Sequence, residues 1–159
     1  MNAVRITAII SILFAVARHP VLAQAADVGQ SICYEVEKSV NALAAPTTTS
    51  CVPSKGPTAG SISFLVICNQ PVFSTEGAKK AWLLVAVGAV GKSLNDRPAV
   101  KADELWLSDL NQTKAKTAYV MPVSVAKNLQ RKAQLDQIAS LDALYAEIQR
   151  ALVKREVKR

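Results

Sequence analysis

Histidine is nearly absent from this chain of 159 residues, whose single histidine is His19. It lies in a stretch with the pattern of a secretory signal peptide: Arg5 provides a positive charge, residues 6–17 form a mostly apolar run, and Ala23-Gln24-Ala25 is a small-x-small cleavage motif. The apolar run would rise about 18 Å as a helix, short of the roughly 30 Å of a membrane core. We therefore predict a cleaved signal peptide over residues 1–25, with an uncleaved anchor or a buried N-terminal helix as the alternatives.

Without histidine, the mature chain lacks the base that usually activates a catalytic serine or cysteine, although lysine and carboxylate bases remain as alternatives. It also lacks the imidazole of a Cys/His metal site, and it contains no CxxC pair. We predict no metal site and no cofactor.

Cysteine is also scarce, with three in the chain: Cys33, Cys51 and Cys68. An exported protein meets an oxidising compartment, so one pair is expected to form a disulfide and one thiol to remain. We favour Cys33 with Cys68, because one lies beside a core-facing helical stripe and the other on the apolar face of a strand. Cys51 is the alternative partner for either, and closing a loop of roughly 18 residues stabilises by about 3 kcal/mol in the chain-entropy estimate.

Aromatic residues make up 5% of the chain. Trp82, Trp106 and Tyr119 each lie in apolar sequence, which favours core filling over ligand stacking. Gly88 and Gly91 stand in a Gly-x-x-Gly-Lys-Ser run that lacks the four-residue spacing of a phosphate-binding loop, so we interpret them as sites of close helix packing.

The pattern of apolar residues predicts a single α+β domain over residues 26–159, with about three strands and four helices in layers. The elements expected are a helix over 27–44, a strand over 61–68, a helix over 78–94, strands over 104–108 and 118–123, a helix over 124–135, and a last helix after the N-cap candidate Ser140. Residues 45–60 are rich in Pro, Thr and Ser and predict a loop. Residues 154–159 predict a basic, frayed tail. If the first two strands are parallel, the helix between them forms a right-handed crossover, and the last two strands form a hairpin.

Positive charge is concentrated towards the C-terminus. The net formal charge is +7. Removing the signal peptide, with Arg5 and Arg18, lowers that charge to +5. Six side chains of the C-terminal part form a candidate site for an anionic ligand: Lys127, Arg131, Lys132, Arg150, Lys154 and Arg155. Aromatic residues do not alternate with them, which argues against nucleic acid as a partner, and an anionic envelope component or another exported protein fits better.

Carboxylates offer a catalytic alternative. Asp103, Glu104 and Asp109 surround Trp106, so a carbohydrate-cleaving pair beside an aromatic side chain is conceivable. The plainer interpretation is that these acids, like Glu35 and Glu37, are surface charges.

The predicted function is therefore that of a small exported bacterial protein, more a binding or accessory protein of the periplasm or cell envelope than an enzyme. The alternative is a small hydrolase that uses these carboxylates or the unpaired cysteine.

Overall fold

The computed structural model describes residues 20–44 and 47–157, which form an α+β fold with a five-stranded mixed sheet and five α-helices. The helices are α2 (Pro20–Leu43), α3 (Glu76–Asn95), α4 (Leu110–Lys114), α5 (Val123–Gln134) and α6 (Leu141–Ala151), and a 3-10 turn spans Val72–Ser74. The strands are β1 (Thr49–Lys55), β2 (Ile62–Cys68), β3 (Ala102–Ser108), β4 (Thr117–Pro122) and β5 (Val153–Glu156). The α+β class is as predicted, but the described residues form five strands and five helices where about three strands and four helices were expected.

The strands lie in the order β1-β2-β3-β4-β5. β2 and β3 are parallel and α3 connects them, as expected for the first two predicted strands, whereas the other three pairings are antiparallel. β3 and β4 are the two strands predicted to pair as a hairpin, and α4 lies in their connection.

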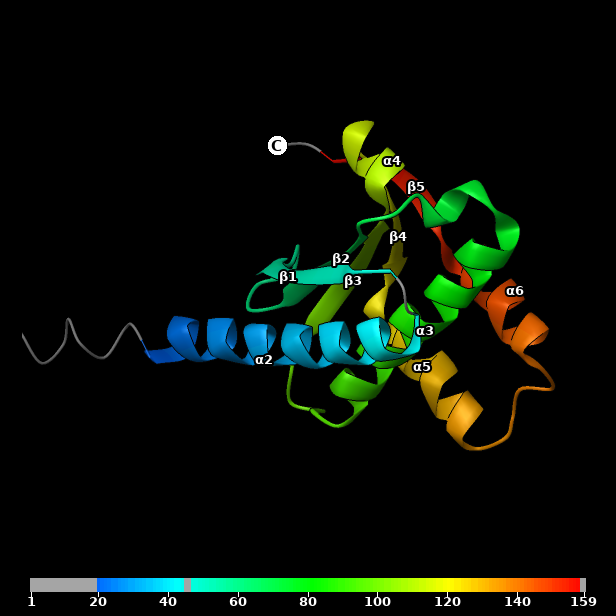
Figure 1. Cartoon of the computed structure of the whole chain (residues 1–159). Helices are drawn as coiled ribbons and strands as arrows, with labels where there is room; N and C mark the ends of the chain where they lie inside the picture. Colours follow the sequence, from blue (N-terminus) through cyan, green and yellow to red (C-terminus); the bar gives the residue numbers. More distant parts are fainter. Residues whose placement is uncertain (1–19, 45–46, 158–159) are drawn as a thin grey trace, which may run out of the picture.

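One face of the sheet is covered by helices. Figure 1 shows α2, α3, α5 and α6 gathered on one side, with α4 near one end of the sheet. The strands contribute Phe64, Val66, Leu105, Leu107 and Met121 to the core below these helices, and each of these side chains is at most 1% exposed. Leu105 and Leu107 share a face, as the alternation in β3 predicts.

Two predicted irregular segments form strands instead. Residues 49–55, within the predicted loop, pair along their whole length with β2, and residues 153–156, at the predicted frayed tail, pair with β4. Both are edge strands whose order depends on partners distant in sequence. Local composition, rich in Pro, Thr and Ser in one case and in charge in the other, carries no signal for such pairing.

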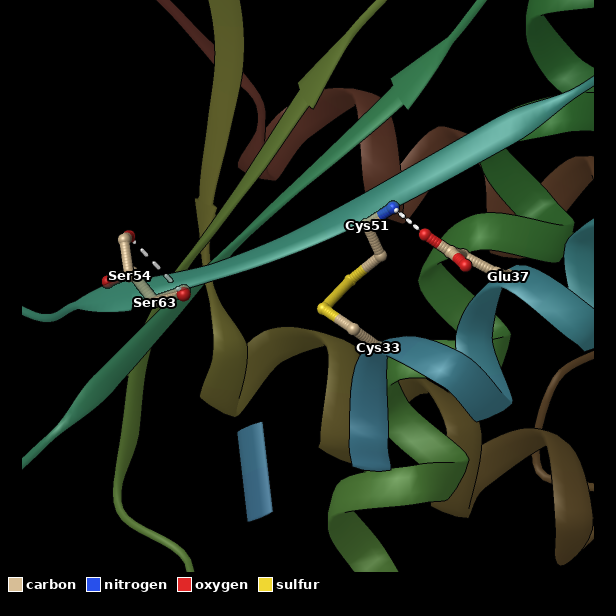
Figure 2. The surroundings of a disulfide bond; sticks show 5 residues. All are labelled: Cys33, Glu37, Cys51, Ser54 and Ser63. Carbon is tan, nitrogen blue, oxygen red and sulfur yellow. Dashed lines mark hydrogen bonds between the residues drawn. A yellow bond between two sulfur atoms is a disulfide. The ribbon is translucent and has the colours of Figure 1, made fainter. Parts of the chain in front are cut away.

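The disulfide joins Cys33 on α2 to Cys51 on β1, and their Cα atoms are 5.0 Å apart (Figure 2). Our preferred pairing of Cys33 with Cys68 is therefore wrong, and the alternative through Cys51 is the one that forms. The physical reason is that α2 packs mainly against β1 rather than β2, so the outer strand supplies the nearer thiol. A loop over residues 45–60 gives Cys51 no fixed position, so the sequence alone does not indicate that Cys51 lies beside α2.

Most of the predicted signal peptide lies outside the described residues, which begin at Pro20. α2 runs across the predicted cleavage site after Ala25. Ile32, Val36 and Val40, whose side chains are fully buried, follow that site. None of the helices in the described ranges is long and apolar enough to cross a membrane.

Candidate functional site

The face of the sheet opposite the helix layer carries a row of apolar side chains, one from each strand. The strand register places Val52 beside Leu65, Leu65 beside Trp106, Trp106 beside Val120, and Val120 beside Val153. Directly paired residues project from the same face of a sheet, so the five side chains form a continuous apolar row. We call the sheet face that bears this row the open face.

The row is exposed at its two ends and more covered in its middle. Val52 and Val153, at its two ends, are 49% and 54% exposed, and Leu65 and Trp106 are half-buried. Val120, between Trp106 and Val153, is 3% exposed. Surface apolar side chains are common singly, but a contiguous apolar surface on a folded domain indicates an interaction site.

The charged groups beside the row neutralise each other. Glu104 accepts a hydrogen bond of 3.1 Å from the indole Nε1 of Trp106 and forms an ion pair of 2.9 Å with Arg155. Because Glu104 pairs with Pro122 on β4 and Arg155 with Ala118, the ion pair spans the sheet across β4. Glu104 therefore holds the tryptophan ring, and Arg155 compensates the charge of Glu104.

A hollow of about 150 Å³ lies beside the row. Its apolar side is formed by Leu65 and Ile67 of β2, and its polar side by Lys116 and by hydroxyl-bearing residues that include Ser108 and Thr113. These two hydroxyl oxygens are 3.1 Å apart, within hydrogen-bonding distance. A hollow of this size and lining can accept one apolar side chain of a partner.

A second hollow, of about 360 Å³, is lined by Asp103, Glu104 and Arg155 and otherwise by apolar side chains. Asp103 accepts hydrogen bonds from the Ser61 hydroxyl and from the backbone N–H of Thr58, the latter at 2.8 Å. These bonds, the Ser61 hydroxyl foremost, hold the pKa of Asp103 below its usual range. The carboxylate therefore stays ionised and anchors the β1–β2 connection.

Asp109, the third acid of the predicted cluster, lies elsewhere. It is fully buried at the end of β3 and accepts hydrogen bonds of 2.9 Å from the backbone N–H groups of Phe73 and Gln112. It is the N-cap of α4. The interpretation of Asp109 as a surface charge is wrong: its carboxylate joins two chain segments inside the molecule.

The other two acids that we interpreted as surface charges also hold the fold together. Glu35 forms an ion pair with Arg97 and accepts a hydrogen bond from Ser93, which connects α2 to α3. Glu37 accepts a hydrogen bond of 2.7 Å from the backbone N–H of Cys51, as Figure 2 shows. Long-range partners such as these cannot be identified from the spacing of acids along a helix.

The predicted basic patch is distributed over three elements. Lys127, Arg131 and Lys132 lie on α5, Arg150 on α6, and Lys154 and Arg155 on β5. Lys132 is 3.5 Å from Glu147, and Arg155 pairs with Glu104. Arg131, Lys132 and Arg150 occupy the last turns of their helices, where a positive charge favours the helix dipole.

The unpaired thiol is that of Cys68, which is fully buried. Burial raises its pKa, so the nucleophilic thiolate is disfavoured.

Two of the three aromatic residues considered above lie on the helix side of the sheet. Trp82 is part of the core and Tyr119 packs against it, whereas Trp106 lies on the open face. The feature that the sequence analysis missed is the open face: the apolar residues Leu65 and Ile67 indicated a two-sided strand, but the row could not be aligned without β1 and β5.

A search with protein-family models gave no match, and comparisons with curated proteins and with solved structures gave none either.

Proposed function

We propose that this chain is an exported bacterial binding or accessory protein of the periplasm or cell envelope, and that it binds another protein through the open face. The observation that carries the proposal is the apolar row Val52–Leu65–Trp106–Val120–Val153, in which Val52 and Val153 are exposed, Leu65 and Trp106 are half-buried and Val120 is buried. The hollow beside Leu65 suits an anchoring side chain of the partner.

The compensation of charge beside Trp106 favours a partner with an apolar surface over an anionic polymer. Glu104 and Arg155 compensate each other at this face. The candidate basic side chains lie on α5, α6 and β5, and two of them are already paired with acids. Burying apolar surface stabilises a complex by roughly 25 cal/mol per Å² before the cost of association, and this contribution depends little on salt.

The test compares two exposed apolar side chains. Val52→Glu places a charge on the open face, and Leu43→Glu, which alters a side chain that is 74% exposed on α2, is the matched control. Partners captured from envelope extract by the mature chain are identified and purified, and their affinities are then measured by calorimetry. We expect Val52→Glu to weaken binding at least tenfold, because a charge buried without a partner is costly, and Leu43→Glu to leave it unchanged.

Two results would contradict the proposal. One is equal affinity of the wild type and Val52→Glu for the purified partner. The other is affinity that falls steeply with salt and is lost when Arg131 and Lys132 are neutralised, which would support the anionic ligand instead.

The second candidate function is a small hydrolase, and the hollow lined by Asp103 and Glu104 is the observation that favours it. Its weakness is the lack of a proton donor: the pKa of Asp103 is lowered rather than raised, and Glu104 is bound to Arg155. Hydrolysis of envelope polysaccharide by the wild type, abolished by Glu104→Gln, would decide for this alternative.

A further inference from the structure

The two edges of the sheet are treated differently. At the β1 edge, alternate residues direct their backbone groups away from β2, and the first three of them, Thr49, Cys51 and Pro53, have the N–H group bound or lack one. The side chain of Asn41 accepts from the N–H of Thr49 at 2.7 Å and donates to its carbonyl at 3.2 Å, and Glu37 accepts from the N–H of Cys51. Pro53 has no N–H group. The β1 edge is therefore closed to another strand over these positions.

The β5 edge has no such closure. All four residues of β5 are exposed. Val157 donates its N–H to the carbonyl of Lys116 at 2.8 Å, which fixes the alternation: Val153, Arg155 and Val157 direct their backbone groups towards β4. Lys154 and Glu156 direct theirs outward. Within the described ranges, no hydrogen-bond partner is present for these outward groups.

The side chains at the β5 edge are complementary to those of a second copy of the same strand. In antiparallel pairing about a twofold axis at Arg155, Lys154 lies opposite Glu156 of the partner subunit, and each such pair exchanges both N–H···O bonds. Val153 then lies opposite Val157 of the partner subunit and extends the apolar row into the second sheet. The residues with outward backbone groups allow two other symmetric registers, which place Lys154 opposite itself or Glu156 opposite itself, and both set like charges together.

Arg155 lies on the axis opposite its own copy. Each Arg155 is bound at 2.9 Å to Glu104 of its own chain, so its charge is compensated before the strands meet. In the described part of the chain, Lys154 and Glu156 have no ionic partner and are free to pair across the axis. Charged side chains usually discourage the addition of a strand at an edge. The opposite charges of Lys154 and Glu156 disfavour an uncharged strand in the same way, but they are complementary to those of a second copy of β5.

We propose that the β5 edge pairs with the β5 edge of a second copy, so that two five-stranded sheets join into one. The partner is this same chain, recognised by backbone hydrogen bonds and by the reciprocal Lys154–Glu156 pairs. The inference concerns the edge of the sheet rather than its open face, and it stands whichever partner the open face binds.

The experiment reverses the two charges separately and together. The processed full chain is studied by sedimentation equilibrium at low salt over a range of concentrations. We expect a monomer–dimer equilibrium in which Lys154→Glu and Glu156→Lys each weaken association about tenfold, because each single change sets like charges opposite at both symmetric positions. The double variant Lys154→Glu with Glu156→Lys should restore association. Lys38→Glu, on the exposed side of α2, is the charge-matched control and should have no effect.

A wild type that sediments as a monomer at every concentration would overturn the proposal. Dimers that persist in both single charge-reversal variants would also overturn it. If Val52→Glu abolished the dimer and Lys154→Glu did not, self-association would be assigned to the open face instead. All of the altered side chains are exposed, and circular dichroism verifies that each variant is folded. Slower hydrogen exchange of the Lys154 and Glu156 amides at high protein concentration is the expected second signature.

Discussion

At the residue scale, Gly88 and Gly91 show how the space around one Cα decides what a glycine does. A Cβ on Gly91 would lie 2.4 Å from the carbonyl oxygen of Ala126 and 2.8 Å from the Cβ of Gln130, so α3 and α5 approach closely here. A Cβ on Gly88 would meet nothing within 4 Å, because this residue borders a groove of about 280 Å³ between α3, α5 and α6. The predicted role in helix packing is confirmed for Gly91 and wrong for Gly88.

The same substitution at these two positions should therefore have opposite effects. We expect Gly91→Ala to lower the free energy of unfolding by about 1–3 kcal/mol, because the added methyl group forces α5 away from α3. Gly88→Ala should raise it by up to about 1 kcal/mol, since alanine has the higher helix propensity and the site is empty. Urea unfolding of both variants measures the two values. A shift of the same sign in both would contradict the packing assigned to α3.

At the scale of elements, the sequence predicts those whose signal is local. Periodicity locates α2, α3 and β2, and Ser140 is the N-cap of α6, where its hydroxyl accepts from the N–H of Ala143 at 3.1 Å. β1 and β5 escape prediction because tertiary contacts order them: β1 between β2 and α2, and β5 along β4. The apolar row of the open face takes one side chain from each of the five strands. It could not be predicted from the sequence because β1 and β5 could not be.

The closure of the β1 edge by α2 gives a prediction at this scale. The N–H of Cys51 belongs to a residue that is 6% exposed, and Glu37 is its acceptor. Glu37→Ala should lower the free energy of unfolding by about 1–3 kcal/mol, because a buried donor is left without a partner. Glu37→Gln keeps an acceptor oxygen and should cost less, the difference reflecting the loss of a charged acceptor.

Chemical denaturation gives the stability of both Glu37 variants, and hydrogen exchange reports the Cys51 amide directly. Faster exchange at Cys51 in Glu37→Ala, with little change in Glu37→Gln, is the expected pattern. Equal stability and exchange in the wild type and Glu37→Ala would show that this hydrogen bond does not hold β1 to α2.

For the whole molecule, the predicted export and the disulfide belong to one argument. Ile32, Val36 and Val40, which are fully buried on α2, and the thiol of Cys33 follow Ala25, so removal of residues 1–25 would leave these three core side chains and the Cys33–Cys51 bond in the chain. An oxidising compartment is the condition under which that bond forms and persists. The bond ties α2 to an edge strand, so its loss should affect the stability of the whole fold rather than one loop.

We therefore expect protein recovered from an exported fraction to begin at Ala26 and to carry the Cys33–Cys51 bond, with Cys68 reacting with alkylating agents only after unfolding. Residues 26–159 produced in a reducing cytosol should contain three thiols and unfold with a free energy lower by about 3 kcal/mol. Intact mass, non-reducing peptide mapping and urea unfolding measure these differences, and Cys68→Ala serves as the variant that keeps the bond. Two results would contradict the coupling of export to stability. A disulfide-linked peptide that contains Cys68 would show that the bond does not join α2 to β1. Equal free energies of unfolding for the two preparations would show that the bond does not constrain the unfolded chain.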